Sequence, residues 1–93
     1  MDRLRSIEYF VCAAEMGSLS AAAHALDVSP PAVSKLLAAL EKRLGLALFS
    51  RTPRGVDLTA DGQTYLVRCR QILRDLESAE AALTTPTQSP VAC

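Results

Sequence analysis

Five basic side chains are concentrated in one short stretch of the sequence, between positions 35 and 54. They share it with a single acidic residue and are Lys35, Lys42, Arg43, Arg51 and Arg54. Lysine and arginine bind phosphate groups, and a cluster that neutralises nucleic-acid phosphates also releases their condensed counterions. The whole chain carries ten basic and ten acidic residues, a formal net charge of +0. The indication of a nucleic-acid partner therefore comes from the local cluster alone.

The residue types that perform catalysis or bind metal ions show no comparable concentration. His24 is the single histidine, and no carboxylate or cysteine stands at metal-ligand spacing from it. The sequence also lacks a Gly-rich phosphate loop and a pair of convergent carboxylates. We therefore expect neither enzymatic activity nor a metal site, and no cofactor.

The three cysteines, Cys12, Cys69 and Cys93, form no metal-ligand motif, and their odd number is not that of a disulfide framework. We expect the first two to pack as small apolar side chains and Cys93 to be an exposed thiol, with a redox role for Cys69 as the minor alternative. The sequence shows no signal-peptide core and no run of about eighteen apolar residues. These features predict a soluble cytoplasmic protein without a membrane partner.

Helices must position most of these side chains, because Ala and Leu outnumber the β-branched and aromatic residues that favour sheets. Apolar residues recur at helical spacing from Asp2 to Met16, and Gly17 is a typical C-cap. Ser18 is a suitable N-cap for a short, alanine-rich helix from Leu19 to Leu26. Small side chains on that helix favour a close crossing with a neighbouring helix.

A third helix is predicted from Pro30 to Leu44, after a break in which Asp27 tolerates a left-handed conformation and Ser29 caps the helix. Its large apolar residues share one face. The opposite face is small and polar, and it consists of Pro31, Ser34, Lys35, Ala38 and Lys42. A helix with a slim cationic face is suited to the major groove of DNA.

A β-hairpin is predicted next, with strands at 46–49 and 56–58. The intervening residues include Pro53 and Gly55, which favour a turn. We expect Arg51 and Arg54 to lie at the tip of this hairpin.

The last predicted helix spans residues 60–83 and is capped by Thr59. Gly62 costs about 1 kcal/mol of helix propensity relative to Ala, which predicts close packing at this position. A heptad seam follows and consists of Tyr65, Cys69, Ile72, Leu76, Ala79 and Leu83. Because the helix is longer than the core of so small a chain, we expect the seam to pair with a second subunit, with packing on its own domain as the alternative. Residues 84–93 are predicted to be a disordered tail.

The order helix, helix, turn, helix, hairpin, helix is that of a winged helix-turn-helix domain. The sequence in addition resembles the N-terminal block of LysR-type transcriptional regulators over roughly Arg3 to Leu83. The matching segments, all in register, are Ala22-Ala23, Ser29 to Ser34, Leu40 to Gly45, Leu48 to Thr52 and Leu58 to Gly62.

This resemblance implies a mainly α fold with a winged helix-turn-helix domain at residues 1–59, followed by a linker and dimerisation helix at 60–83. The helix-turn-helix would span 18–37 and the wing 46–58. A bacterial homodimer would then bind a partly palindromic promoter or operator site in double-stranded DNA. The DNA-facing residues would be Ser29, Pro30, Pro31, Ser34, Lys35, Ala38, Arg51 and Arg54.

Two positions depart from the pattern of the family. Pro30 stands where Gln is most common, and proline cannot hydrogen-bond to a base edge. Lys35 stands where Arg is common, and lysine lacks the fork that binds guanine bidentately. Both departures predict weaker or altered direct readout of the bases, with more of the recognition left to the wing, the phosphates and DNA shape.

Complete LysR-type regulators continue into an effector-sensing domain that has no counterpart in these residues. No small-molecule effector site is therefore expected in this chain. An alternative hypothesis is a short interaction module that forms mixed dimers with full-length LysR-type subunits.

Overall fold

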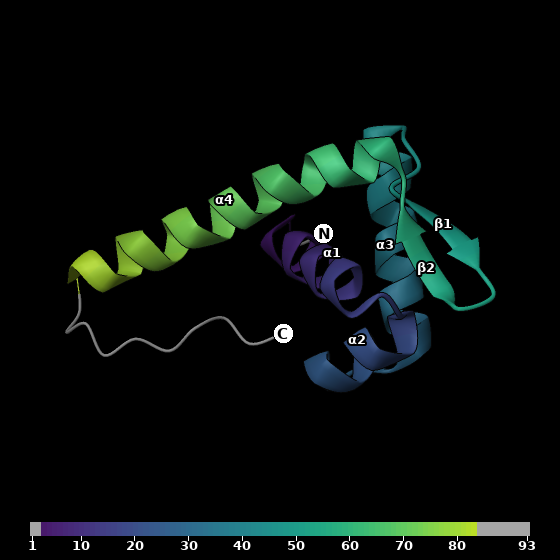
Figure 1. Cartoon of the computed structure of the whole chain (residues 1–93). Coiled ribbons are helices and arrows are strands. Elements are labelled where there is room, and N and C mark those ends of the chain that lie inside the picture. Colours follow the sequence, from purple (N-terminus) through teal and green to yellow (C-terminus); the bar gives the residue numbers. More distant parts are fainter. Residues whose placement is uncertain (1–2, 84–93) are drawn as a thin grey trace.

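The computed structural model describes residues 3–83. A three-helix unit is followed by a two-stranded hairpin and a long helix (Figure 1). The elements are α1 Arg3–Met16, α2 Leu19–Leu26, α3 Pro30–Leu44, β1 Phe49–Thr52, β2 Gly55–Leu58 and α4 Ala60–Leu83. The predicted mainly α, winged helix-turn-helix architecture is confirmed. The predicted helical residue Asp2 and the predicted tail at 84–93 lie outside the described residues.

The predicted caps set the boundaries of the helices. The hydroxyls of Ser18, Ser29 and Thr59 each accept a hydrogen bond from the backbone N–H three residues later, at 3.2, 3.3 and 3.0 Å. Asp27 ends α2 in the left-handed conformation, with φ of 59°. Because these local contacts turn the chain sharply between α2 and α3, the two helices pack against each other in the crossing of a helix-turn-helix.

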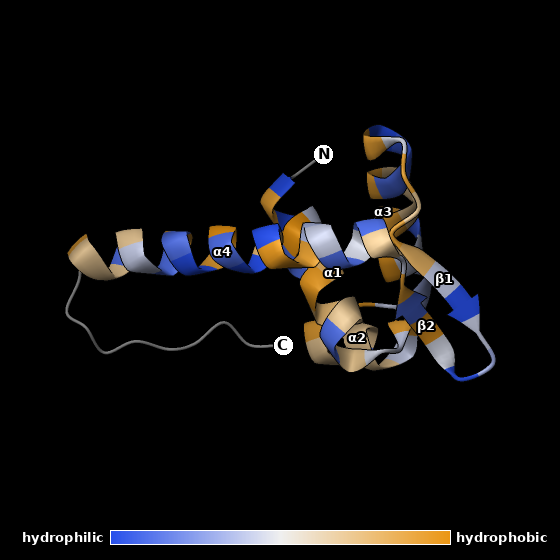
Figure 2. Cartoon of the chain, turned by 45° about the horizontal axis from the view of Figure 1, so that its top comes forward, coloured by the Kyte–Doolittle hydropathy of each residue, from blue (hydrophilic) through white to orange (hydrophobic). Residues whose placement is uncertain are grey.

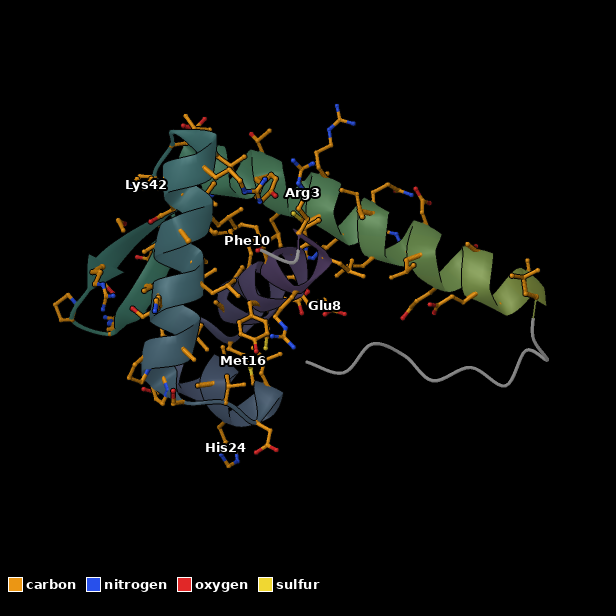
Figure 3. All side chains as sticks on the ribbon, turned by 180° about the vertical axis from the view of Figure 1, so that it is seen from behind. Arg3, Glu8, Phe10, Met16, His24 and Lys42 are labelled. Atoms are coloured by element: carbon orange, nitrogen blue, oxygen red, sulfur yellow. The ribbon has the colours of Figure 1, made fainter. Side chains whose placement is uncertain are left out.

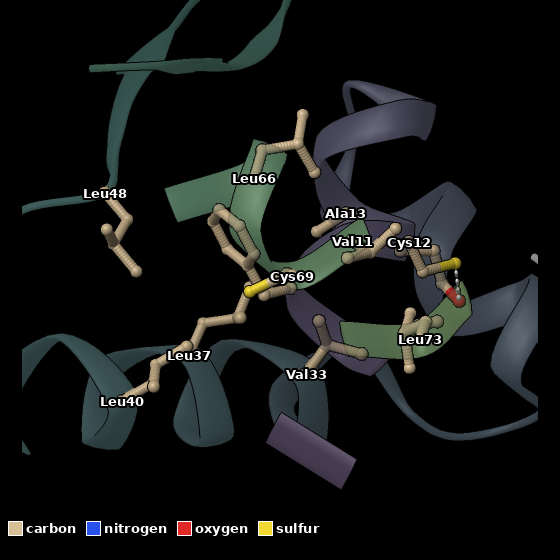
Figure 4. Packing of buried hydrophobic residues seen from close by; sticks show 13 residues of the cluster. Val11, Cys12, Ala13, Val33, Leu37, Leu40, Leu48, Leu66, Cys69 and Leu73 are labelled. Carbon is tan, nitrogen blue, oxygen red and sulfur yellow. Dashed lines mark hydrogen bonds between the residues drawn. The ribbon is translucent and has the colours of Figure 1, made fainter. Parts of the chain in front are cut away.

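Phe10 of α1 lies at the centre of the hydrophobic core and is fully buried. Its ring is 5.3 Å from the ring of Phe49 and 5.1 Å from that of Tyr65, both in tilted contacts. Buried apolar side chains from α1, α3 and α4 form one cluster with Phe10 (Figure 4), and Phe49 and Tyr65 pack against it. The core therefore joins the start of the wing and the first half of α4 to the helix-turn-helix.

The first half of α4 belongs to the same core as the preceding helices. Leu66, Cys69 and Leu73 are buried, and Arg70 pairs with Glu15 of α1 at 3.0 Å. Thr59 thus caps a helix whose first half packs in the core of the helix-turn-helix. The second half of α4 extends away from the body, with polar and apolar residues mixed along it (Figure 2).

The first strand of the hairpin differs from the prediction. It spans Phe49–Thr52 instead of residues 46–49, with Phe49 opposite Leu58 and Thr52 opposite Gly55. The apolar run before Phe49 predicts a strand, but Leu48 is buried in the core and donates its backbone N–H to the Glu41 carboxylate. Core packing, rather than strand pairing, explains Leu48, whereas Leu46 is 46% exposed.

Gly55 allows the close contact that fixes the second strand of the wing. Gly55 has φ of 145°, and a Cβ there would collide with the backbone carbonyl of Gly17. The next residue, Val56, donates its N–H to that same carbonyl at 3.3 Å. The second strand is therefore attached to the turn between α1 and α2.

Candidate nucleic-acid interface

The outer face of α3 presents most of the residues that the sequence predicted for DNA contact. The exposed members of this set are Ser29, Pro30, Pro31, Lys35 and Ala38. Ser34 is half-buried, and Ser29 also uses its hydroxyl to cap the helix. The opposite face of α3 is held in the core by Val33, Leu37 and Leu40, so the small polar face is directed outward.

The wing supplies two further exposed cations, and they occupy different parts of the hairpin. Arg54 lies in the turn at the tip, as predicted. Arg51 lies within β1, opposite Val56, because the strand starts later than expected. Its guanidinium Nη2 donates a hydrogen bond to the Ser34 hydroxyl at 3.2 Å. The structure thus brings Ser34 and Arg51 together, across the boundary between helix and wing.

A shallow groove of about 120 Å³ separates α3 from the hairpin. Its lining consists of Leu19, Ser34, Leu37, Ala38, Glu41, Phe49, Arg51 and Val56. The lining combines apolar side chains with the polar side chains of Ser34, Glu41 and Arg51. Because the groove lies beside the exposed face of α3, ligand contact on that face would also involve the wing.

Glu41 is a functional candidate that the sequence analysis did not identify. Its Oε2 atom accepts the backbone N–H of Leu48 at 2.7 Å and that of Phe49 at 3.1 Å. A lone acidic residue within a basic stretch was the one available signal. That acid holds the backbone at the start of β1.

Not all of the basic cluster faces the same way. Lys42 is exposed at the end of α3 that is farthest from α2 (Figure 3). Arg43 instead lies close enough to α4 to affect Tyr65: burial raises the pKa of the Tyr65 phenol, the neighbouring Cys69 adds to this, and the Arg43 charge opposes it. All five cations of the cluster are exposed, and Arg43 is the one whose charge acts on a residue of α4.

The other candidate residues occupy separate places. His24 is exposed on α2 (Figure 3). Cys69 is fully buried, and burial raises the pKa of its thiol to about 11, with the hydrogen bond to Tyr65 opposing the shift. A buried, protonated thiol is a poor nucleophile, so the packing role expected for Cys69 fits better than the redox alternative. Cys12 is also buried, 3.9 Å from the Ala22 carbonyl oxygen (Figure 4), and Cys93 lies outside the described residues.

The predicted heptad seam is divided between two environments. Tyr65 is half-buried against Phe10, and Cys69 has no exposed surface, so the start of the seam packs on its own domain. The prediction that Cys69 faces a partner is wrong, because α4 rotates this residue into the core. The rest of the seam is accessible: Ile72 is 44% and Leu83 is 88% exposed, while Ala79 is exposed and Leu76 half-buried.

The family model described as "Bacterial regulatory helix-turn-helix protein, lysR family" matches residues 4–63. The HTH-type transcriptional regulator ClcR of Pseudomonas putida is 45% identical over 73 residues, which cover 78% of this chain and 25% of ClcR. The HTH-type transcriptional repressor PA14_22550 of Pseudomonas aeruginosa (strain UCBPP-PA14) is 37% identical, covering 98% of this chain and 29% of the repressor. The chain thus spans between a quarter and a third of the length of these relatives.

Solved structures of DNA complexes are also similar to this chain. The CbnR DNA-binding domain in complex with DNA has a TM-score of 0.77 at 39% identity, covering 90% of this chain and 100% of that one. The BenM DNA-binding domain in complex with benA site 1 DNA has a TM-score of 0.84 at 29% identity, covering 89% of this chain and 92% of that one.

None of the helices between residues 3 and 83 combines the length and the apolar character that a membrane span requires.

Proposed function

The chain belongs to the LysR family of bacterial regulatory helix-turn-helix proteins, and from this premise we propose that it is the sequence-specific DNA-binding domain of a transcription regulator. One observation carries the proposal: nearly the whole chain matches isolated DNA-binding domains that were solved on DNA. The exposed cationic residues on α3 and the wing provide groups that can bind DNA phosphates and base edges.

In this proposal α3 enters the major groove and the wing contacts the adjacent backbone. Ser29, Pro30, Pro31, Lys35 and Ala38 form the groove-facing side of α3, and Ser34 lies at its edge beside Arg51. Lys35 is the single charged group among them that can donate hydrogen bonds to a base edge. Arg51 and Arg54 neutralise phosphates, so affinity should fall steeply as salt is added.

The proposal includes a homodimer that forms through the second half of α4. Ile72, Leu76, Ala79 and Leu83 provide an apolar stripe that is accessible in the isolated domain. A two-fold dimer places two α3 helices on successive major-groove segments, so the site would be a partly palindromic promoter or operator.

The relatives named above are transcription regulators, which supports a role that involves no catalysis. We place the protein in the bacterial cytoplasm, where it would associate with the nucleoid. The activity of a complete regulator, including effector sensing, would need residues beyond this domain, and no effector site is proposed here.

The test is a fluorescence-anisotropy titration against a pooled promoter library and a random duplex of equal length, at two salt concentrations. Salt-sensitive binding with enrichment of a two-fold symmetric site is expected. Enrichment without symmetry would contradict the dimeric arrangement. Binding to neither duplex would overturn the proposal and favour a module that acts by mixed dimerisation with full-length subunits, a role that the same exposed stripe of α4 could serve.

A further inference from the structure

Two polar side chains on one face of α3 contact the first strand of the wing. Ser34 and Glu41 are seven residues apart, which places them roughly two helical turns from each other on the same side of the helix. Both line the groove between α3 and the hairpin. We propose that they are positioning residues that hold the wing in its DNA-binding orientation, and we call this pair the wing anchors. The inference rests on the proposed function.

Glu41 holds the main chain of the wing. Its single Oε2 atom accepts the N–H groups of Leu48 and Phe49 at 2.7 and 3.1 Å. Hydrogen bonds to a carboxylate are stronger than those between neutral groups, and Glu41 is half-buried, where water competes less for its oxygens. The position at which β1 starts is therefore set by a side chain of α3.

Ser34 holds a side chain of the wing. The Arg51 guanidinium donates to its hydroxyl at 3.2 Å, and Arg51 is two residues beyond Phe49, on the same side of β1. Four N–H donors of the guanidinium then stay available for phosphate oxygens. Ser34 thus acts through Arg51, whereas the sequence had placed it among the residues that touch DNA.

Because Glu41 is negatively charged, the direction in which its removal changes DNA affinity tests the proposal. It is the only acidic residue between positions 35 and 54. If Glu41 acted on DNA by charge alone, its removal would strengthen binding, because a carboxylate repels phosphates. If it anchors the wing, removal of its acceptor oxygen should weaken binding.

The first experiment compares Glu41→Ala with Glu41→Gln by DNA titration. Glu41→Ala is expected to weaken binding on the order of tenfold, because two charge-assisted hydrogen bonds are lost. Glu41→Gln keeps an acceptor oxygen but no charge, so it should bind at least as tightly as the parent protein. The matched control is Asp57→Asn, which removes an exposed acid from β2 and should bind slightly more tightly. Unchanged or tighter binding by Glu41→Ala would overturn the anchor role of Glu41.

The second experiment is a double-mutant cycle between Ser34 and Arg51. Ser34→Ala alone should weaken binding about threefold, should have no effect when Arg51→Ala is already present, and should be rescued by Ser34→Thr. An equal loss in both backgrounds would mean that Ser34 contacts DNA itself, and its anchor role would be overturned.

A third measurement separates the wing anchors from DNA binding. Amide hydrogen exchange at Leu48 and Phe49 should be about tenfold faster in Glu41→Ala than in the parent protein, and near the parent rate in Glu41→Gln. Circular dichroism confirms that each variant is folded. If the parent protein bound no DNA, the proposed function would fail, while slower exchange in the parent than in Glu41→Ala would still support the anchor contact. Identical exchange rates would overturn it.

Discussion

Gly62, in the first turn of α4, lies directly against the carbonyl oxygen of Leu48. A Cβ at this position would collide with that oxygen and would come within 2.9 Å of the Leu58 Cδ2 atom. The oxygen is itself fixed, because it accepts the N–H of Thr59 at 3.0 Å. The close packing expected at Gly62 is confirmed, and its partner is the segment just before β1.

We predict that Gly62→Ala destabilises the domain. Alanine gains about 1 kcal/mol in helix propensity, but overpacking against a fixed backbone costs about 1–3 kcal/mol. The free energy of unfolding, measured by urea titration, should therefore fall by about 1 kcal/mol. The adjacent exposed substitution Gln63→Ala is the control and should change it by less than about 0.5 kcal/mol. A more stable Gly62→Ala would show that the contact relaxes freely.

The buried thiol of Cys69 predicts a loss of stability at alkaline pH. Its pKa is about 11 in the folded chain, raised from 9.0 because burial disfavours the thiolate. The folded state therefore keeps a proton that the unfolded state releases near pH 9. The contribution of the Cys69 thiol to the free energy of unfolding is therefore fully present below pH 9 and is lost as the pH rises toward 11.

Urea titrations of the parent protein and Cys69→Ala at several pH values test this expectation. The variant should be less stable by about 1 kcal/mol at pH 7, because a buried sulfur is replaced by a small cavity. That difference should shrink between pH 9 and 11, since only the parent protein loses the thiol contribution. A difference that stays constant over this range would contradict the raised pKa.

Lys35 and Arg54 should affect DNA binding in different ways. Arg54→Ala removes a phosphate contact at the tip of the wing, so it should weaken binding to all sequences alike and reduce the salt slope by about 1. Lys35→Ala removes a donor that faces the bases, so it should change base preference as well. Titrations against specific and random duplexes distinguish the two, and equal losses on both for Lys35→Ala would exclude its readout role.

The exposed stripe of α4 predicts a dimer that one charge can disrupt. Ile72→Glu places a carboxylate within the apolar stripe and should shift analytical ultracentrifugation profiles from dimer to monomer. Val67→Glu is the matched control, because Val67 is 64% exposed on a different side of the same helix. It should leave the association unchanged. Equal effects of both substitutions would argue against the stripe as the interface.

Local hydrogen-bonding chemistry made the helices predictable. Caps at Ser18, Ser29 and Thr59, and the left-handed Asp27, act within a few residues, so the sequence pattern contains them in full. The outward-facing side of α3 was predictable for the same reason, because its large apolar residues recur at helical spacing on the opposite side. These features depend on neighbours along the chain.

Contacts between distant residues were not predictable in the same way. The start of β1 at Phe49 depends on Glu41, eight residues upstream, and this start places Arg51 within the strand, opposite Val56. Likewise, a heptad pattern on α4 cannot distinguish the core of its own domain from a partner, because both require apolar residues at helical spacing. Burial of Cys69 depends on where α1 and α3 lie.

The continuity of α4 gives the domain a mechanical property. One uninterrupted helix of 24 residues is rooted in the core and carries the exposed stripe, with a length of about 36 Å. The first half of α4 cannot bend without disturbing the buried Leu66 and Leu73. In a dimer, the crossing angle between the two α4 helices would therefore set the relative position of the two α3 helices, as a lever does. A change of about 10° would displace a point at the far end of such a lever by roughly 6 Å, nearly two base-pair steps of about 3.4 Å. The distance between two half-sites would then be determined at the subunit contact, far from any base.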